Sequence, residues 1–110
     1  MCKEMKSRIM NELIKENIDK IIEICKNNKV KSLFVFGSAA TGKFNKDSDI
    51  DLLISFEKMS HGEYAETYFD VAEKFEGILN KHVDLVTERS MSNPYFIESV
   101  NRTKLLIYAN

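Results

Sequence analysis

The chain has 110 residues, 44% of them hydrophobic, and a formal net charge of −1. This length predicts a single domain over residues 1–110, and the 16 basic residues are spread too widely to favour a nucleic-acid partner. No run approaches the roughly 20 apolar residues that cross a bilayer, and the charged N-terminal segment lacks the apolar region of a secretory signal, so we expect a cytoplasmic protein with no membrane partner.

The first predicted element is a long amphipathic helix. From Met10, apolar residues recur in steps of three and four, which predicts one helix of about 20 residues ending near Asn27. Cys25 falls on its apolar face, where we expect a buried free thiol. Residues 32–36 and 50–56 then predict two buried strands, and the segment between them is rich in Gly, Ser and Thr.

The alternation of helices and strands continues to the end of the chain. Four more elements are predicted: a helix from after Gly62 to about Asn80, a strand at residues 82–87, a short helix through Val100 and an edge strand at residues 105–108. Asn93 and Pro94 are typical of the N-cap and first residue of that short helix. This order predicts a sheet covered by helices.

Two aspartates alternate in residues 47–54, at the start of the second predicted strand. Because side chains of a strand point to its two faces in turn, Asp49 and Asp51 share one face. Such a pair repels unless a cation lies between the carboxylates, and their hard oxygen ligands suit Mg²⁺. Asp84 lies among apolar residues of the next strand, so three acids meet if the two strands pair. Three carboxylates are what two-metal phosphoryl transfer needs.

A turn at residues 36–38 predicts a binding place for phosphate. It leaves a buried strand and enters a segment that can be helical, so its backbone N–H groups and the helix dipole can face an anion. Gly37 lets the backbone approach closely, the Ser38 hydroxyl can donate to a phosphate oxygen, and Gly42 lets the chain turn back toward the acids.

Taken together, these motifs resemble a known family. Gly37-Ser38, Gly42, Asp49-Ile50-Asp51 and Val83-Asp84-Leu85 are similar to the minimal nucleotidyltransferases of the DNA polymerase β superfamily, over about residues 30–108. The resemblance implies an α+β nucleotidyltransferase fold, a mixed sheet packed against helices. The chain has Thr41 and Lys43 where many relatives have an arginine and an acid.

The resemblance also implies an activity and a partner. Gly37 and Ser38 would bind nucleotide phosphates, Asp49 and Asp51 would bind two Mg²⁺ ions, and Asp84 would bind the catalytic ion and help to deprotonate the nucleophile. Members this small resemble antitoxins, which transfer AMP from ATP to a tyrosine of a HEPN-type ribonuclease toxin.

Other readings of the same residues make different predictions. Residues 37–43 fit the first seven positions of a Walker A loop, but Phe44 cannot place a hydroxyl on Mg²⁺. Residues 47–51 imitate an EF-hand, but Leu52 and Lys58 replace its glycine and glutamate. We therefore expect neither motif. An antitoxin that neutralises its partner by contact alone remains an alternative, as does transfer to a small molecule, although 110 residues leave no second domain to shape an acceptor pocket.

Several further residues have ordinary structural explanations. An acidic stripe is expected to be a solvated helix face, with docking to a basic toxin as the alternative: Glu63, Glu66, Asp70 and Glu73. Tyr68 and Phe75 are predicted core residues. We expect His61, in a loop, and His82, before a strand, to be ordinary solvated or hydrogen-bonded histidines.

Overall fold

The computed structural model of the protein describes residues 12–41 and 49–110. Its helices and strands follow the predicted order, with these bounds: α2 Glu12–Glu16, α3 Ile18–Asn27, β1 Val30–Phe36, α4 Ser38–Thr41, β2 Ile50–Phe56, α5 His61–Leu79, β3 Val83–Thr87, the 3₁₀ turn η1 Glu88–Ser90, α6 Pro94–Thr103 and β4 Leu105–Ala109. Within the described residues no helix is long and apolar enough to cross a membrane. Cys2, Gly42, Lys43 and Asp47 lie outside the described residues.

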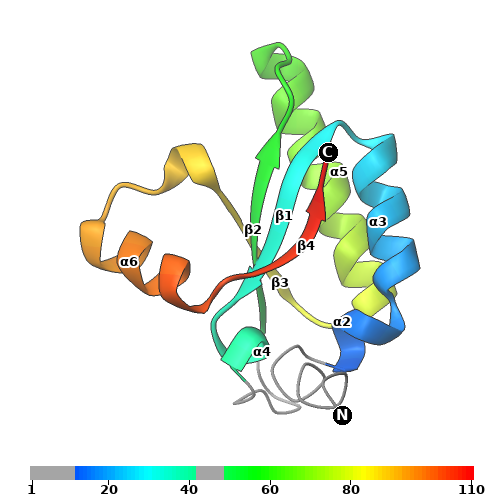
Figure 1. Ribbon diagram of the computed structural model, residues 1–110. Helices are drawn as coiled ribbons and strands as arrows, with labels where there is room; N and C mark the ends of the chain where they lie inside the picture. The colour runs from blue at the N-terminus through cyan, green and yellow to red at the C-terminus, as the bar shows by residue number, and fades with distance from the viewer. Residues whose placement is uncertain (1–11, 42–48) are drawn as a thin grey trace.

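The four strands form one mixed sheet in the order β3-β2-β1-β4. β1 is antiparallel to both β2 and β4, whereas β2 and β3 are parallel and are joined through α5. The predicted position of residues 105–108 at a sheet edge is confirmed. α3 and α5 cover one face of the sheet, and α6 lies on the other side (Figure 1).

Alternation along the strands divides the core between these two faces. Leu33 and Val35 of β1 belong to the larger cluster, which includes Phe75 of α5. Phe36 belongs to the smaller one, with Leu53 of β2 and Val100 of α6 as its other buried members. The sheet is thus buried on both faces, but more extensively under α3 and α5.

The predicted single N-terminal helix is wrong in one respect, because α2 and α3 are separate elements. Asn17 interrupts them: its side-chain amide donates to the carbonyl of Leu13 at 2.9 Å, and its backbone is not helical, with φ −110° and ψ 14°. Asparagine side chains compete in this way with backbone hydrogen bonds. The apolar stripe still continues across the break, and Cys25 is fully buried as expected.

Local signals at helix ends were accurate. The side-chain oxygen of Asn93 accepts hydrogen bonds from the backbone N–H groups of Tyr95 and Phe96, which confirms it as the N-cap of α6. One placement needs correction: His61 is the first residue of α5 instead of a loop residue, because the Ser60 hydroxyl accepts from the Glu63 N–H and starts the helix there.

Most residues for which we predicted an ordinary structural role have that role in the structure. All four acids of the stripe are exposed; Glu63 pairs with Lys29, and Asp70 with Lys74. Phe75 is core as predicted, whereas Tyr68 is only half-buried. His82 is exposed and contacts Glu76 at 3.1 Å.

Candidate active site

Two of the three predicted metal ligands lie opposite each other in the sheet. The register of the parallel strands β2 and β3 pairs Asp51 with Asp84, and neighbouring strands lie about 4.8 Å apart. Asp51 is also the register partner of Phe36 on β1, so both carboxylates belong to the face on which α6 packs. Asp49 immediately precedes β2. The expected pairing of the two strands is confirmed, and it brings the three acids to one end of the sheet.

These acids make the site strongly negative. Burial, together with the charges of Asp84 and Asp49, raises the pKa of Asp51 from 3.8 to about 6. Asp49 and Asp84 are exposed, and no described residue donates a hydrogen bond to either carboxylate or forms an ion pair with it. A divalent cation would offset this repulsion, and the oxygen donors suit Mg²⁺.

The three carboxylates lie at the same end of the sheet, but their side chains do not form a complete metal-binding site. As the side chains lie, no group of three His, Cys, Asp or Glu residues within 12–41 and 49–110 could hold a metal ion. Because Asp49 and Asp84 are exposed, their side chains have room to turn toward Asp51. The donor set therefore fits a cation, provided that the two outer carboxylates reorient.

The turn between β1 and α4 lies directly against Asp51. Gly37 has a φ of 71°, and a Cβ at this position would be 2.5 Å from Oδ2 of Asp51. The predicted passage from strand to turn to helical segment is confirmed, since Ser38–Thr41 form α4 and the Ala40 N–H donates to the Gly37 carbonyl at 3.0 Å. The side chains of Ser38 and Thr41 are not among the described parts, so the role of the Ser38 hydroxyl stays a prediction.

A residue that sequence reasoning missed holds this turn from the other side. The backbone N–H of Gly37 donates to Oγ1 of Thr103, the last residue of α6, at 3.4 Å. The Thr103 hydroxyl in turn donates to the carbonyl of Ser99 at 3.1 Å. The ring of Phe36 also meets that of Phe96 edge to face, with centroids 6.0 Å apart. These partners are about 60 residues apart in sequence, and no local pattern marks them.

The outer edge of β3 is supported by α5. The Tyr68 hydroxyl donates to the carbonyl of Leu85 at 2.5 Å, and the Val83 N–H donates to Oε2 of Glu76 at 3.1 Å. Burial raises the pKa of Tyr68, and the charge of Asp84 adds to that shift. Tyr68 packs against the core as predicted, although it is only partly buried, and its hydroxyl also satisfies the strand edge beside Asp84.

Comparison with known proteins agrees with this geometry. A relative from Methanocaldococcus jannaschii, provisionally named protein adenylyltransferase MJ1379, is 40% identical over 96 residues, which are 86% of this chain and 93% of the relative. A solved structure described as a minimal nucleotidyltransferase is 30% identical, with a TM-score of 0.66, over 90% of this chain and 97% of its own. A crystal structure of a toxin-antitoxin with AMP-PNP is 26% identical, with a TM-score of 0.67, over 86% and 74% of the two chains.

The family described as polymerase beta nucleotidyltransferase matches residues 19–110. That span includes the Gly37 turn and all three aspartates. The mixed sheet with its paired Asp51 and Asp84 is the arrangement that the resemblance implied. The chain therefore belongs to the polymerase β nucleotidyltransferase family.

Proposed function

We propose that the chain transfers AMP from ATP to a hydroxyl of a partner protein, a HEPN-type toxin, and thereby acts as its antitoxin. The observation that carries this proposal is the pairing of Asp51 with Asp84 beside the Gly37 turn. The name of the Methanocaldococcus relative supports adenylyl transfer to protein. The solved toxin-antitoxin with AMP-PNP supports both the nucleotide and the kind of partner.

Each site residue has a distinct role in this reaction. Asp49 and Asp51 are the residues that would hold two Mg²⁺ ions, and Asp84 would bind the catalytic one; the ions would neutralise charge on the triphosphate. The backbone of the turn from Gly37 into α4, with Ser38, binds the phosphates. The Asp84 carboxylate accepts the proton of the acceptor hydroxyl. That oxygen then bonds to the α-phosphorus while the bond to pyrophosphate breaks.

The test is transfer of label from α-³²P-ATP to a purified HEPN-type toxin, with Mg²⁺ present. We expect wild type to label the toxin covalently, and Asp51→Asn and Asp84→Asn to lose at least a hundredfold in rate while remaining folded. Asp19→Asn is the matched control, since Asp19 is an exposed aspartate of α3, which covers the face of the sheet opposite to α6 (Figure 1). Equal labelling by wild type and both site variants would refute the assignment.

The same experiment separates catalysis from inhibition by contact. If the chain and the toxin co-purify and the ribonuclease is silenced without any covalent label, the chain acts by binding alone. If silencing requires ATP and disappears in Asp51→Asn, transfer is the mechanism. Mass spectrometry of the labelled toxin then identifies the acceptor residue, for which a tyrosine is expected.

A further inference from the structure

A cavity lies at the opposite end of β2 from the carboxylates. It has a volume of about 400 Å³ and is lined by the end of β2, the following loop, the first turn of α5 and η1: Ile54, Ser55, Phe56, Glu57, Lys58, Met59, Tyr64, Glu88 and Arg89. Ser55 is four residues beyond Asp51 along an extended strand, or about 13 Å at roughly 3.3 Å per residue. The cavity is therefore a separate place from the candidate active site.

Its position and size are those of ligand sites in related architectures. β2, α5 and β3 form a strand–helix–strand unit with parallel strands, and ligands of such units bind beyond the carboxyl ends of the strands. Small-molecule pockets measure about 300–1,000 Å³ and combine apolar walls with a few polar groups. This cavity fits both descriptions.

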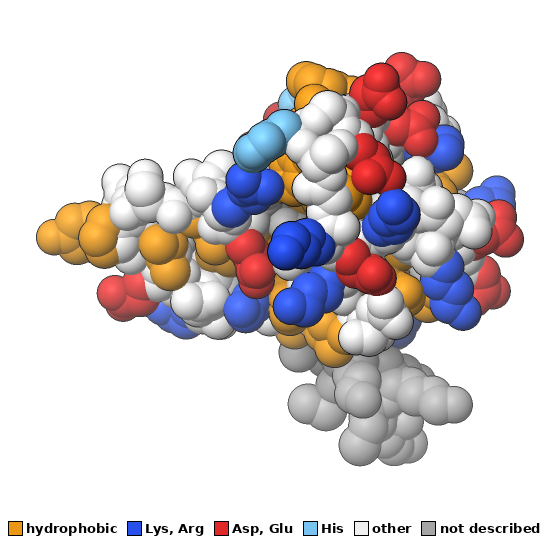
Figure 2. Space-filling view, turned by 90° about the horizontal axis from the view of Figure 1, so that it is seen from above, with side chains coloured by type: hydrophobic (Ala, Val, Ile, Leu, Met, Phe, Trp, Pro, Cys, Tyr) orange, Lys and Arg blue, Asp and Glu red, His pale blue; other side chains and the backbone are white. Residues whose placement is uncertain are grey.

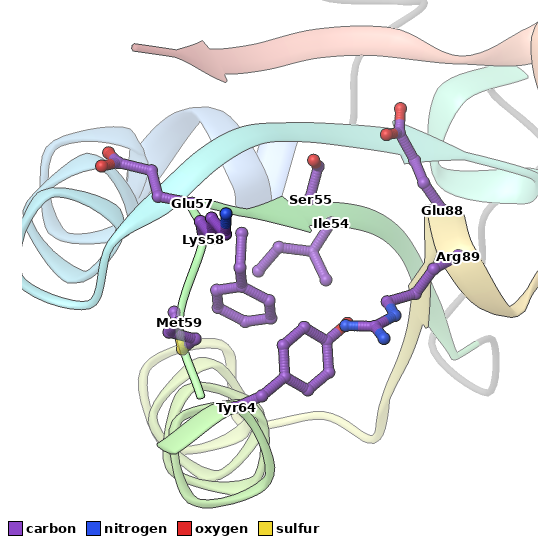
Figure 3. Close-up of a pocket in the computed structure, with 9 residues that line it drawn as sticks. Ile54, Ser55, Glu57, Lys58, Met59, Tyr64, Glu88 and Arg89 are labelled. Atoms are coloured by element: carbon purple, nitrogen blue, oxygen red, sulfur yellow. The ribbon is translucent and has the colours of Figure 1, made fainter. Parts of the chain in front are cut away.

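Aromatic rings form one wall. Phe56 and Tyr64 meet edge to face, with ring centroids 5.3 Å apart. The guanidinium carbon of Arg89 lies 4.7 Å from the centroid of Tyr64, and Figure 3 shows the guanidinium group beside that ring. A planar arginine stacked in this way keeps its N–H donors available at its edge.

The charge that reaches the cavity is mainly positive. Within the described chain, neither Lys58 nor Arg89 forms an ion pair or a hydrogen bond. The two acids of the lining are directed elsewhere: Glu57 accepts a hydrogen bond from the side chain of Asn110 at 2.6 Å, and Figure 3 shows the carboxylates of Glu57 and Glu88 pointing away from Tyr64. Figure 2 looks onto this end of the sheet and shows Lys and Arg side chains near its centre, with Asp and Glu side chains among them.

We propose that this cavity binds a small aromatic phosphate, with the chemistry of a nucleoside monophosphate. The ring of the ligand packs against Phe56 and Tyr64, and its phosphate receives hydrogen bonds from Arg89 and Lys58. The two positive charges of Arg89 and Lys58, neither of which forms an ion pair with a described residue, balance the two negative charges of a phosphate group. The planar guanidinium group can also donate two parallel hydrogen bonds to two phosphate oxygens. This site is independent of the transfer reaction and of the three aspartates.

The test is a titration of the ¹⁵N-labelled full chain by NMR in EDTA, with three probes that separate ring from charge: AMP, adenosine and ribose 5-phosphate. We expect AMP to change the amide chemical shifts of residues 54–59, 64 and 88–89. Its affinity should be at least tenfold higher than that of adenosine or of ribose 5-phosphate. Shifts confined to the Gly37 turn and the start of β2, or no shifts at millimolar AMP, would overturn the proposal.

Variants of the lining assign the contacts. Arg89→Gln should weaken AMP about tenfold, the loss of one charge-assisted contact, and leave adenosine unchanged. Tyr64→Leu should weaken AMP and adenosine alike. Arg102→Gln, which changes an exposed arginine on α6, should bind AMP like wild type. Spectra of the free variants report whether the fold is intact, and an Arg89→Gln protein that is folded and binds AMP normally would contradict the proposed contact.

Discussion

Replacing Gly37 with alanine tests the contact on which the candidate active site depends. The new Cβ would be 2.5 Å from Oδ2 of Asp51, whereas ordinary contact begins at 3.4 Å, so the carboxylate must move by about 0.9 Å. In addition, the φ of 71° at this position is left-handed, which costs a residue with a side chain about 1–2 kcal/mol. Displacements on the order of 1 Å in a catalytic constellation can lower the rate about a hundredfold.

We therefore expect Gly37→Ala to lose about 1–2 kcal/mol of unfolding free energy and about a hundredfold in transfer rate. Urea unfolding measures the first quantity, and single-turnover labelling of the toxin at saturating ATP measures the second. Gly37→Asn separates the two causes. Asparagine tolerates the left-handed conformation better, so it should be less destabilised than alanine, yet its Cβ displaces Asp51 equally and its rate should be as low.

A glycine elsewhere supplies the control. Gly77 lies within α5, and a Cβ there would meet nothing within 4 Å. Gly77→Ala should raise stability by about 0.5–1 kcal/mol, because alanine has the higher helix propensity, and should leave the transfer rate unchanged. A Gly37→Ala protein that is folded and transfers AMP at the wild-type rate would refute the reasoning from the Asp51 contact.

Three further outcomes are expected. Burial and neighbouring acids raise the pKa of Asp51 from 3.8 to about 6, so ionisation of Asp51 destabilises the metal-free fold as pH rises through this window. In EDTA, Asp51→Asn should therefore be more stable than wild type above pH 6 and equally stable below pH 3.8. A difference in unfolding free energy that stays constant with pH, measured by urea unfolding, would disprove this. Burial raises the pKa of Cys25 to about 12, so in a Cys2→Ser chain a thiol reagent should react only at the rate of unfolding, and rapid labelling of native protein would show that Cys25 is accessible. Thr103→Val should speed hydrogen exchange at the Gly37 amide and raise the KM for ATP, because it removes the hydroxyl that accepts the Gly37 N–H. Thr103→Ser keeps a hydroxyl and should have the wild-type exchange rate and KM. Unchanged exchange in the valine variant would exclude the hydrogen bond.

Local patterns were enough to predict most elements and the identity of the acids. The strand at residues 50–56 has the predicted bounds, and Asn93 caps α6 as expected, because alternation and capping depend on residues a few positions apart. The break between α2 and α3 escaped prediction, since the apolar stripe runs unbroken past Asn17 while a single side-chain hydrogen bond interrupts the helix.

From sequence alone we could predict the candidate site residues: Asp51 and Asp84 on strands, Asp49 beside one, and Gly37 in a turn. How these residues meet became clear from the three-dimensional fold. The register that pairs Asp51 with Asp84, the contact of Gly37 with Asp51 and the hydrogen bond from Gly37 to Thr103 all join residues distant in sequence. Such contacts depend on strand order and helix packing, which local periodicity does not encode, and the same is true of the cavity that brings Arg89 against Tyr64.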